Sequence, residues 1–226
     1  MKIGIFGTGP VGQTLAAALS ALDHDTFIGT RDPAATLARQ DNDSFGNPPF
    51  RTWRENNPGI GFGSFEQAAR HGEMLINATN GNGSLAAIEA AGAGAIGGKV
   101  LIDVSNPLDF SRGMPPRLFI SNDDSLGEQI QRAMPQARVV KTLNTVNAYL
   151  MVDPKQLAGG DHTMFMAGND ADAKEAARTL LSGFGWSDIV DLGDISNARA
   201  TEMYLPFWAR IWMATKNPMF SIKLVR

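Results

Sequence analysis

The stretch MKIGIFGTGPVGQTLAAALSALDHDTFIGTR, residues 1–31, decides the fold of this chain. Residues 3–6 form a short apolar run that enters a glycine-rich turn, and apolar residues then recur at helical spacing across 11–22. A second apolar run follows at 24–29. The sequence therefore predicts a strand, a tight turn, a helix and a second strand, which together begin a βαβ unit.

The predicted turn contains three glycines, Gly7, Gly9 and Gly12, in the spacing GxGxxG. The first permits a tight turn, the second lets the backbone approach a pyrophosphate, and the third allows close packing of the helix on the strand. The N-terminus of the helix that follows favours an anion. This pattern makes the turn a candidate dinucleotide-binding loop, with Gly7, Thr8, Gly9, Pro10, Val11 and Gly12 as its residues.

The second strand ends in Gly29, Thr30 and Arg31, where NAD enzymes of this fold place an acidic residue for the ribose hydroxyls. An acid would repel the 2′-phosphate of NADP, whereas a hydroxyl and a guanidinium donate hydrogen bonds to it. Thr30 and Arg31 therefore favour NADP(H) as the cofactor. The alternative is that Arg31 is a solvated surface residue beside Asp32.

The rest of the chain continues the alternation of strands and helices, which predicts a parallel sheet. After Asp153-Pro154 the pattern restarts. We expect an α/β fold, a Rossmann-type doubly wound parallel sheet (residues 1–155) that binds NADP, with a small C-terminal α/β domain (156–226). Further strands are predicted at residues 59–63, 74–78, 100–104, 138–143, 163–167 and 189–192.

Several helix boundaries follow from capping residues. Ser64 with Gln67 has the spacing of a capping box, and Ser84 is expected to cap a helix that ends at Ile96. A long apolar helix is expected from Ser196. Residues 40–58 are rich in Asn, Asp, Pro and Arg, which predicts a surface loop or irregular helix and leaves open whether it forms a lid.

Composition excludes several classes of function. A chain of 226 residues with 43% hydrophobic residues can bury a full core, so it is a globular protein. Its 20 basic and 23 acidic residues give a net charge of -3 without a basic run, which argues against a nucleic acid partner. The absence of cysteine excludes thiolate metal sites and suits the cytoplasm. We expect no metal, and no apolar run is long enough for a membrane span.

The chain resembles the NADPH-dependent coenzyme F420 reductase family, which comprises deazaflavin-dependent NADP oxidoreductases and is akin to the cytosolic domain of the STEAP metalloreductases. The similarity spans nearly the whole chain, and the C-terminal GDISNAR segment makes it specific. The motifs that carry it are GTGPVG and GTR in residues 7–31, IDVSNPL at 102–108, KTLNTVNA at 141–148, and GDISNAR followed by TEMYLPFW at 193–208.

This resemblance implies an enzyme in which a nicotinamide lies across the carboxyl ends of the strands, with a second ring stacked on it for direct hydride transfer. Such chemistry needs proximity more than an acid or base, and we assign no catalytic side chain. Asn side chains in the loops offer amide contacts to the carboxamide, although each alone also suits a turn. The candidate residues follow three strands: Ala78, Thr79, Asn80 and Gly81; Asn106 and Pro107; Leu143, Asn144 and Thr145.

The identity of the electron acceptor stays open. The loop NATNGNGS, residues 77–84, is polar where deazaflavin reductases are expected to carry an apolar, Pro-containing segment. The alternatives to F420 are a flavin, a quinone, a ferric chelate reduced through free flavin, and a small carbonyl or imine compound. Lys141 with Asn144 would suit a hydroxyacid dehydrogenase. A non-catalytic NADP(H)-binding sensor is the alternative from another class.

The C-terminal helix is predicted to be apolar on nearly all sides, with a kink at Pro206. A helix of this kind has to be buried over most of its surface. A segment of about 70 residues offers little core for it. We therefore expect a homodimer whose interface also walls the acceptor pocket.

Overall fold

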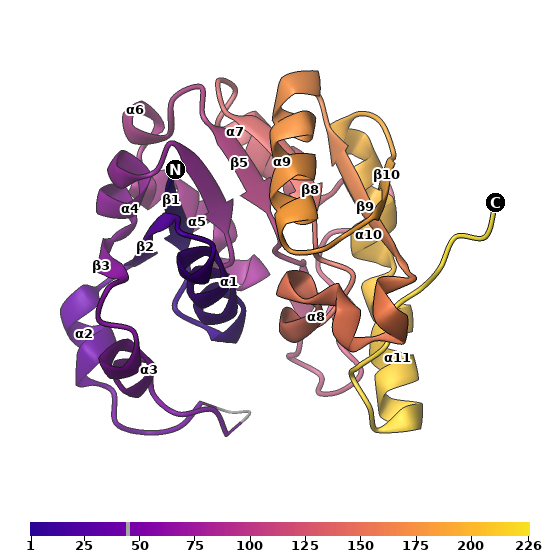
Figure 1. The fold of residues 1–226 in the computed structure, drawn as a ribbon, viewed down its shortest axis with the longest axis horizontal. Coiled ribbons are helices and arrows are strands. Elements are labelled where there is room, and N and C mark those ends of the chain that lie inside the picture. The colour runs from indigo at the N-terminus through magenta and orange to yellow at the C-terminus, as the bar shows by residue number, and fades with distance from the viewer. Residues whose placement is uncertain (44–45) are drawn as a thin grey trace.

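The computed structural model describes residues 1–43 and 46–226, and within them eight strands form one sheet in the order β10-β9-β8-β5-β4-β1-β2-β3 (Figure 1). From β3 to β8 this is the strand order of a doubly wound nucleotide-binding fold. The strands β1 to β3 follow one another toward one side of the sheet, and β4, β5 and β8 follow one another toward the other side, so the order switches between β1 and β4. The strands are β1 (Lys2–Phe6), β2 (Asp25–Thr30), β3 (Gly61–Ser64), β4 (Met74–Asn77), β5 (Val100–Asp103), β8 (Arg138–Thr142), β9 (Thr163–Gly168) and β10 (Asp188–Asp191).

The parallel sheet expected for residues 1–155 is confirmed, and β9 and β10 extend it into a mixed sheet. Strands β1 to β5 and β8 are parallel, whereas β9 pairs with β8 in antiparallel orientation and β10 runs parallel to β9. The chain between β8 and β9 contains α8 (Ala148–Val152) and two short 3-10 helices, Pro154–Gln156 and Ala158–Gly160. Because this connection starts β9 at the edge where β8 ends, the chain need not cross the sheet.

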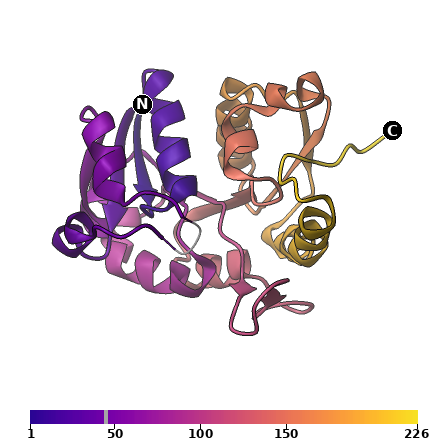
Figure 2. The same cartoon turned by 90° about the horizontal axis from the view of Figure 1, so that it is seen from below.

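Helices cover both faces of the sheet, as the view from below in Figure 2 shows. The strands bury both sides of the pleat: Ile76 and Ile102 belong to one core cluster and Leu75 and Leu101 to the other. The first cluster includes α1 (Pro10–Ala21), α8 and α9 (Ala171–Gly183), and the second includes α4 (Phe65–His71), α5 (Gly81–Ala91), α6 (Ala93–Ile96) and α7 (Leu126–Ala133).

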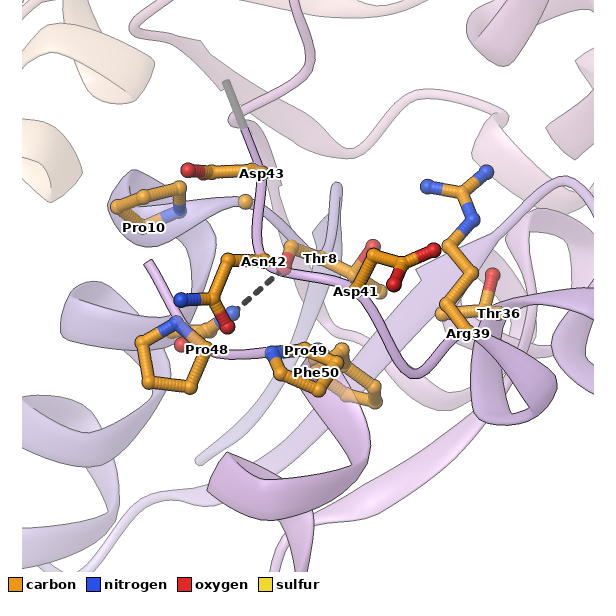
Figure 3. Close-up of a pocket in the computed structure, with 12 residues that line it drawn as sticks. Thr8, Pro10, Thr36, Arg39, Asp41, Asn42, Asp43, Pro48, Pro49 and Phe50 are labelled. Carbon is orange, nitrogen blue, oxygen red and sulfur yellow. Dashed lines mark hydrogen bonds between the residues drawn. The ribbon is translucent and has the colours of Figure 1, made fainter. Parts of the chain in front are cut away.

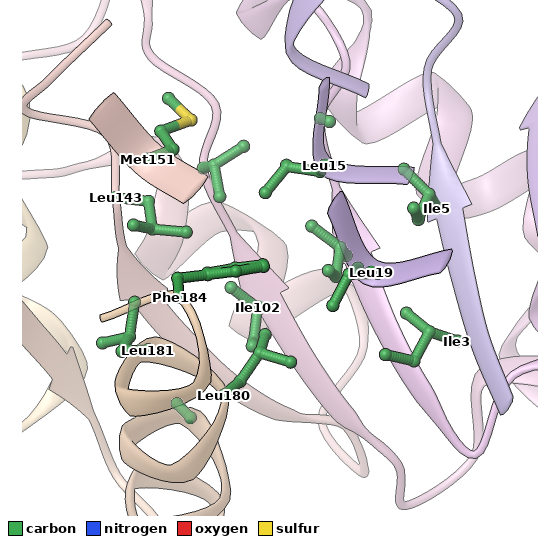
Figure 4. Packing of buried hydrophobic residues seen from close by; sticks show 14 of the residues in the cluster. Ile3, Ile5, Leu15, Leu19, Ile102, Leu143, Met151, Leu180, Leu181 and Phe184 are labelled. Atoms are coloured by element: carbon green, nitrogen blue, oxygen red, sulfur yellow. The ribbon is translucent and has the colours of Figure 1, made fainter. Parts of the chain in front are cut away.

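The first core cluster joins the two halves of the chain. In Figure 4, Leu15 and Leu19 of α1 face Leu180 and Phe184 at the end of α9, with Ile102 of β5 behind them. The boundary expected near residue 155 falls between α8 and β9. The segments on its two sides thus share a sheet and a core, and their division into two domains remains a prediction.

The capping predictions had mixed outcomes. The capping box at Ser64 is confirmed, with the Ser64 hydroxyl accepting from the Gln67 backbone N–H at 3.2 Å and the Gln67 side chain accepting in return. The prediction for Ser84 is wrong, because α5 begins at Gly81 and is capped by Asn80. The helix expected to reach Ile96 is interrupted at Gly92, whose φ of +85° separates α5 from α6.

Two segments add structure that the sequence left undefined. After α2 (Pro33–Ala38), the stretch 40–58 contains α3 (Phe50–Asn56), whose Phe50 stacks on Trp53 and packs against Phe62. Residues 44–45 of that stretch lie outside the described residues, and its role as a lid remains a prediction. After β5, the short strands β6 (Leu108–Asp109) and β7 (Arg117–Leu118) form a hairpin that the sequence did not predict.

The long C-terminal helix expected from Ser196 is a chain of three shorter helices. A 3-10 helix (Ile195–Asn197) leads into α10 (Ala198–Met203), and α11 (Leu205–Thr215) follows, with Pro206 in its first turn. The expected kink therefore lies at the junction of α10 and α11, at Tyr204. Burial of α11 on most sides is not found within one subunit, because only Leu205 and Ala209 of this helix are buried.

Candidate functional site

The turn between β1 and α1 has the backbone that its glycines permit. Gly7 has a φ of +118°, and a Cβ there would lie 2.5 Å from the carbonyl oxygen of Ala78. A Cβ on Gly12 would lie 2.0 Å from the carbonyl oxygen of Gly7, whereas one on Gly9 would meet no atom within 4 Å. The loop is therefore packed against the protein at Gly7 and Gly12 and open at Gly9, where a ligand can approach.

The N-terminus of α1 is suited to hold an anion at this open position. Gly9 is its N-cap and supplies no side-chain cap, and Pro10 occupies the first turn. The side-chain amide of Gln13 donates to the carbonyl oxygen of Thr8 at 2.8 Å, which ties the loop to α1. The half-buried Val11 packs on the core. Uncapped N–H groups and the helix dipole at this end favour a phosphate.

A cavity of about 530 Å³ extends from the glycine loop to the end of β2. Thr30 lines this cavity at the end of β2, and its hydroxyl lies 3.1 Å from the hydroxyl of the buried Thr36. The structure thus brings the two predicted cofactor segments, 7–12 and 30–31, to one cavity. The lining residues are Gly7, Thr8, Gly9, Thr30, Arg31, Asp32, Ala35, Thr36, Arg39, Phe65, Ala78, Thr79, Asn80, Gly83 and Ala87.

Arg31 is exposed at the rim of this cavity. In the part of the chain that the structure describes, its guanidinium has neither an ion pair nor a hydrogen bond. The neighbouring Asp32 instead caps α2, accepting from the backbone N–H of Ala35 at 2.9 Å. The guanidinium therefore remains free to pair with an anionic ligand.

A second cavity of about 380 Å³ lies on the other side of the glycine loop, between it and the segment that precedes α3 (Figure 3). Its lining includes Asp41, Pro49 and Phe50. Thr36 and Arg39 line both cavities. The sequence analysis missed these two residues, although Arg39 is a second cation shortly after Arg31 in the sequence.

The loop after β4 holds its polar side chains in local hydrogen bonds. The hydroxyl of Thr79 donates to the amide oxygen of the buried Asn77 at 2.6 Å and lies 2.8 Å from the hydroxyl of Ser84. Asn80 caps α5 by accepting from the backbone N–H of Asn82 at 3.1 Å, which is the turn role considered as the alternative for each Asn. A Cβ on Gly81 would lie 2.0 Å from the carbonyl oxygen of Asn106, so this loop abuts the next one.

The loops after β5 and β8 are joined by a reciprocal pair of hydrogen bonds. Asn106 donates from its amide to the backbone carbonyl of Asn144 at 3.0 Å, and Asn144 donates from its amide to the amide oxygen of Asn106 at 2.9 Å. Asn144 is buried, and its own amide oxygen accepts no hydrogen bond from the described residues. The pair therefore keeps one acceptor unsatisfied at the carboxyl edge of the sheet.

The other candidates in these two loops are buried. Leu143 is in the left-handed region with φ of +62°, and its side chain belongs to the core, so the backbone is what it offers to a ligand. Thr145 is 5% exposed. The carbonyl of Pro107 accepts from the backbone N–H of Phe119 at 3.0 Å and ties the hairpin to the site.

A cluster of buried charges lies directly behind these loops. Lys141 on β8 is fully buried and donates to Asp103 at 2.8 Å, to Glu202 at 2.7 Å and to the carbonyl of Ser105. Burial by itself lowers the pKa of Lys141, but the carboxylates of Asp103 and Glu202 outweigh it and raise the pKa above its usual value. An ammonium with three acceptors and no exposed surface is poorly placed to act as an acid with Asn144, so the structure does not favour the hydroxyacid dehydrogenase alternative.

The sequence analysis gave Asp103 and Glu202 no role. Glu202 on α10 accepts from the backbone N–H groups of Leu126 and Gly127 at 2.8 and 3.0 Å, so it caps α7 across 76 and 75 residues of sequence. Asp103 accepts from the amide of Asn77 at 2.8 Å. Acidic residues in otherwise apolar strand or helix segments were the signal for this cluster.

A second ion pair joins α10 to α7. Arg199 donates to both carboxylate oxygens of Glu128, at 2.6 and 2.8 Å. Hydrogen bonding from Arg199 holds the pKa of Glu128 below its usual value despite the opposing effect of burial. The C-terminal segment 193–203 is therefore fixed to α7 and β8 by Arg199 and Glu202.

The strand order, the glycine loop and the cavity at the end of β2 define a Rossmann-type dinucleotide-binding protein. A crystal structure from Arthrobacter sp. FB24, of a protein proposed to be an F420-dependent NADP-reductase, is 53% identical with a TM-score of 0.95 and full coverage of both chains. The family model for coenzyme F420-dependent NADP oxidoreductases matches residues 2–107. The chain belongs to this family.

More distant relatives agree with this assignment. The F420-dependent NADP reductase of Methanocaldococcus jannaschii is 26% identical over 99% of this chain and 98% of its own length. Rat metalloreductase STEAP3 is 25% identical over 92% of this chain, which spans 38% of that longer protein. An imine reductase from Bacillus cereus shares the fold, with a TM-score of 0.59 at 15% identity.

Proposed function

We propose that this protein transfers a hydride between NADPH and coenzyme F420. The observation that carries the proposal is the cofactor groove, open at Gly9 and bordered at the end of β2 by Thr30 and an unpaired Arg31 in place of an acid. Family membership supports F420 as the acceptor. The relatives that are named F420-dependent NADP reductases match this chain along nearly its whole length.

The residues present fit NADP(H). The pyrophosphate would be held by the open backbone at Gly9 and the uncapped N-terminus of α1, and the 2′-phosphate by Thr30 and Arg31. The loops after β4, β5 and β8 would receive the nicotinamide. There the unsatisfied amide oxygen of Asn144 is an acceptor suited to the carboxamide N–H.

The chemistry is carried by the two ring systems: NADPH supplies the hydride, and F420 takes it up together with a proton from water. The chain contributes position. No side chain among residues 78–81, 106–107 and 143–145 is ionisable, which agrees with a site that orients two rings without a general acid or base. Asn106 and Asn144 fix each other, so the wall facing the rings is held rigid.

Replacing Asn144 with leucine tests this placement. The change removes the acceptor and leaves the Asn106 amide oxygen without its donor, so we expect turnover to fall by about tenfold while the dissociation constant for NADPH changes by less than about threefold. Stopped-flow turnover and calorimetry measure the two quantities. Asn56→Leu on the exposed face of α3 is the matched control, and equal kinetics in both variants would place the nicotinamide elsewhere.

The acceptor is tested by a screen. The protein is mixed with NADPH and, in separate samples, F420, FMN, riboflavin or ferric citrate, and oxidation of NADPH is followed by its absorbance. We expect turnover with F420 to exceed that with every other acceptor. NADPH binding without turnover in any sample would instead favour a non-catalytic sensor. The likeness to imine reductases, at 15% identity, concerns the fold alone.

The protein is further proposed to act as a homodimer through α11. Phe207 is 59% exposed on this helix, and Met203 just before it is 40% exposed, although both lie in an apolar segment. Trp208 of the same helix stacks on Phe220 near the C-terminus, with ring centroids 5.2 Å apart. A second copy covering this patch would wall the acceptor pocket, with residues 1–155 binding NADP and 156–226 forming the interface.

Light scattering at micromolar concentration tests the dimer. We expect twice the monomer mass of 24.2 kDa for the native protein and the monomer mass for Phe207→Glu, because a carboxylate buried in an apolar interface is strongly disfavoured. Leu22→Glu, at a position 44% exposed after α1, is the control and should stay dimeric. A native protein at 24.2 kDa would contradict the proposal.

We place the protein in the cytoplasm, because NADPH is available there and a cysteine-free chain suits a reducing compartment. Across residues 1–43 and 46–226, no helix combines the length and the apolar character needed to cross a membrane.

A further inference from the structure

A second arginine, Arg39, lines the cavity that contains Thr30 and Arg31. Arg39 ends α2 as its C-cap, and its side chain lines both the cavity that contains Thr30 and Arg31 and the cavity beneath the segment before α3 (Figure 3). Residues that line both cavities stand at the border between them. Arg39 therefore reaches the same space as the predicted ligands of the 2′-phosphate.

The backbone that carries Arg39 is fixed to the end of β2. The hydroxyls of Thr30 and Thr36 lie 3.1 Å apart, and both side chains are buried. Thr36 lies on α2 and Arg39 is the residue that directly follows the helix, and the side chains of both line the cavity. The contact between Thr30 and Thr36 thus holds α2 at the cavity.

The charge of Arg39 is uncompensated by direct contacts. In the described part of the chain, its guanidinium makes no ion pair within 4 Å and no hydrogen bond, although Asp41 lines the second cavity with it. The carboxylate of Asp32 is occupied by the N–H of Ala35. Two guanidiniums, Arg31 and Arg39, therefore border one cavity without anionic partners of their own.

We infer that Arg39 is a second ligand of the 2′-phosphate of NADP(H), acting with Arg31 to select NADPH over NADH. This rests on the proposed function, because it requires NADP(H) in the groove. A phosphomonoester carries up to two negative charges and offers three oxygens, more than one guanidinium satisfies. The pyrophosphate, by contrast, is matched by the backbone at Gly9 and the N-terminus of α1.

Calorimetry with NADPH and NADH on the native protein and on Arg39→Ala tests the inference. We expect the dissociation constant for NADPH to rise by about tenfold, as for loss of one charge-assisted hydrogen bond, while that for NADH changes by less than about threefold. Arg51→Ala is the control, because Arg51 is an exposed arginine of α3 that lines neither cavity. This control should bind both cofactors as the native protein does.

Two results would overturn the role of Arg39. Equal losses for NADPH and NADH would make it a ligand of the part that both cofactors share, and unchanged binding of NADPH would make it a surface residue. Failure of the NADP(H) assignment has a different signature, since the native protein would then show no preference for NADPH. Because Arg39 is exposed and unpaired among the described residues, its removal leaves the fold intact.

Discussion

Replacing Thr30 and Arg31 together with alanine is expected to weaken NADPH binding by about ten- to a hundredfold. Charge-assisted hydrogen bonds contribute about 1.5–3 kcal/mol, and each 1.4 kcal/mol corresponds to about tenfold in affinity. NADH lacks the 2′-phosphate, so its affinity should change by less than about threefold. Calorimetry with both cofactors measures the difference.

Two further properties of the variant series follow from the same contact. Arg31→Lys should recover only part of the affinity, because a point charge replaces a planar fork of donors. Since Arg31 is exposed, the preference for NADPH should also weaken with added salt. Equal affinity for the two cofactors in the native protein, or equal losses in the double variant, would mean that Thr30 and Arg31 do not select the cofactor.

Replacing Lys141 with methionine is expected to lower the free energy of unfolding by about 3–5 kcal/mol, as for other buried ion pairs that lose one partner. The variant would leave Asp103 and Glu202 buried without their cation, and both carboxylates are at most 2% exposed. Denaturant unfolding at neutral pH measures the loss. A domain of ordinary stability remains folded after a change of this size.

The surface provides a matched control for this prediction. Lys174 pairs with Asp191 at 2.8 Å, the same distance as Lys141 and Asp103, but the aspartate side chain there is 37% exposed. Lys174→Met should therefore cost no more than about 1 kcal/mol. If the two variants lost equal stability, the buried cluster would not be what anchors α10 to β8.

Local patterns predicted the first half of the fold well. The glycine loop, the strands on either side of it and the capping box at Ser64 depend on residues that are close in sequence, so their spacing is informative. Ser84 was misjudged because its hydroxyl is turned inward to Thr79, while Asn80 takes the cap. Both residues suit a helix start, and the tertiary contacts of the loop decide between them.

Other features depend on contacts that no local pattern encodes. The apolar run in β9 marks a strand but not its direction, which is set by how the connection from β8 runs. Strands β6 and β7 have two residues each, too few for any period to appear. Lys141 and Asp103 are 38 residues apart in the sequence. No local pattern connects them, and each stands in the sequence as a single charged residue in an apolar strand.

Transfer of hydride from NADPH to F420 can be followed with an isotopic label. NADPH carrying deuterium at the transferred position is mixed with oxidised F420 and the protein, and the reduced F420 is examined by mass spectrometry. The account predicts rapid reduction of F420, with one deuterium recovered in it for each NADPH consumed. Tight binding of NADPH without reduction of F420, or reduced F420 that carries no deuterium, would contradict it.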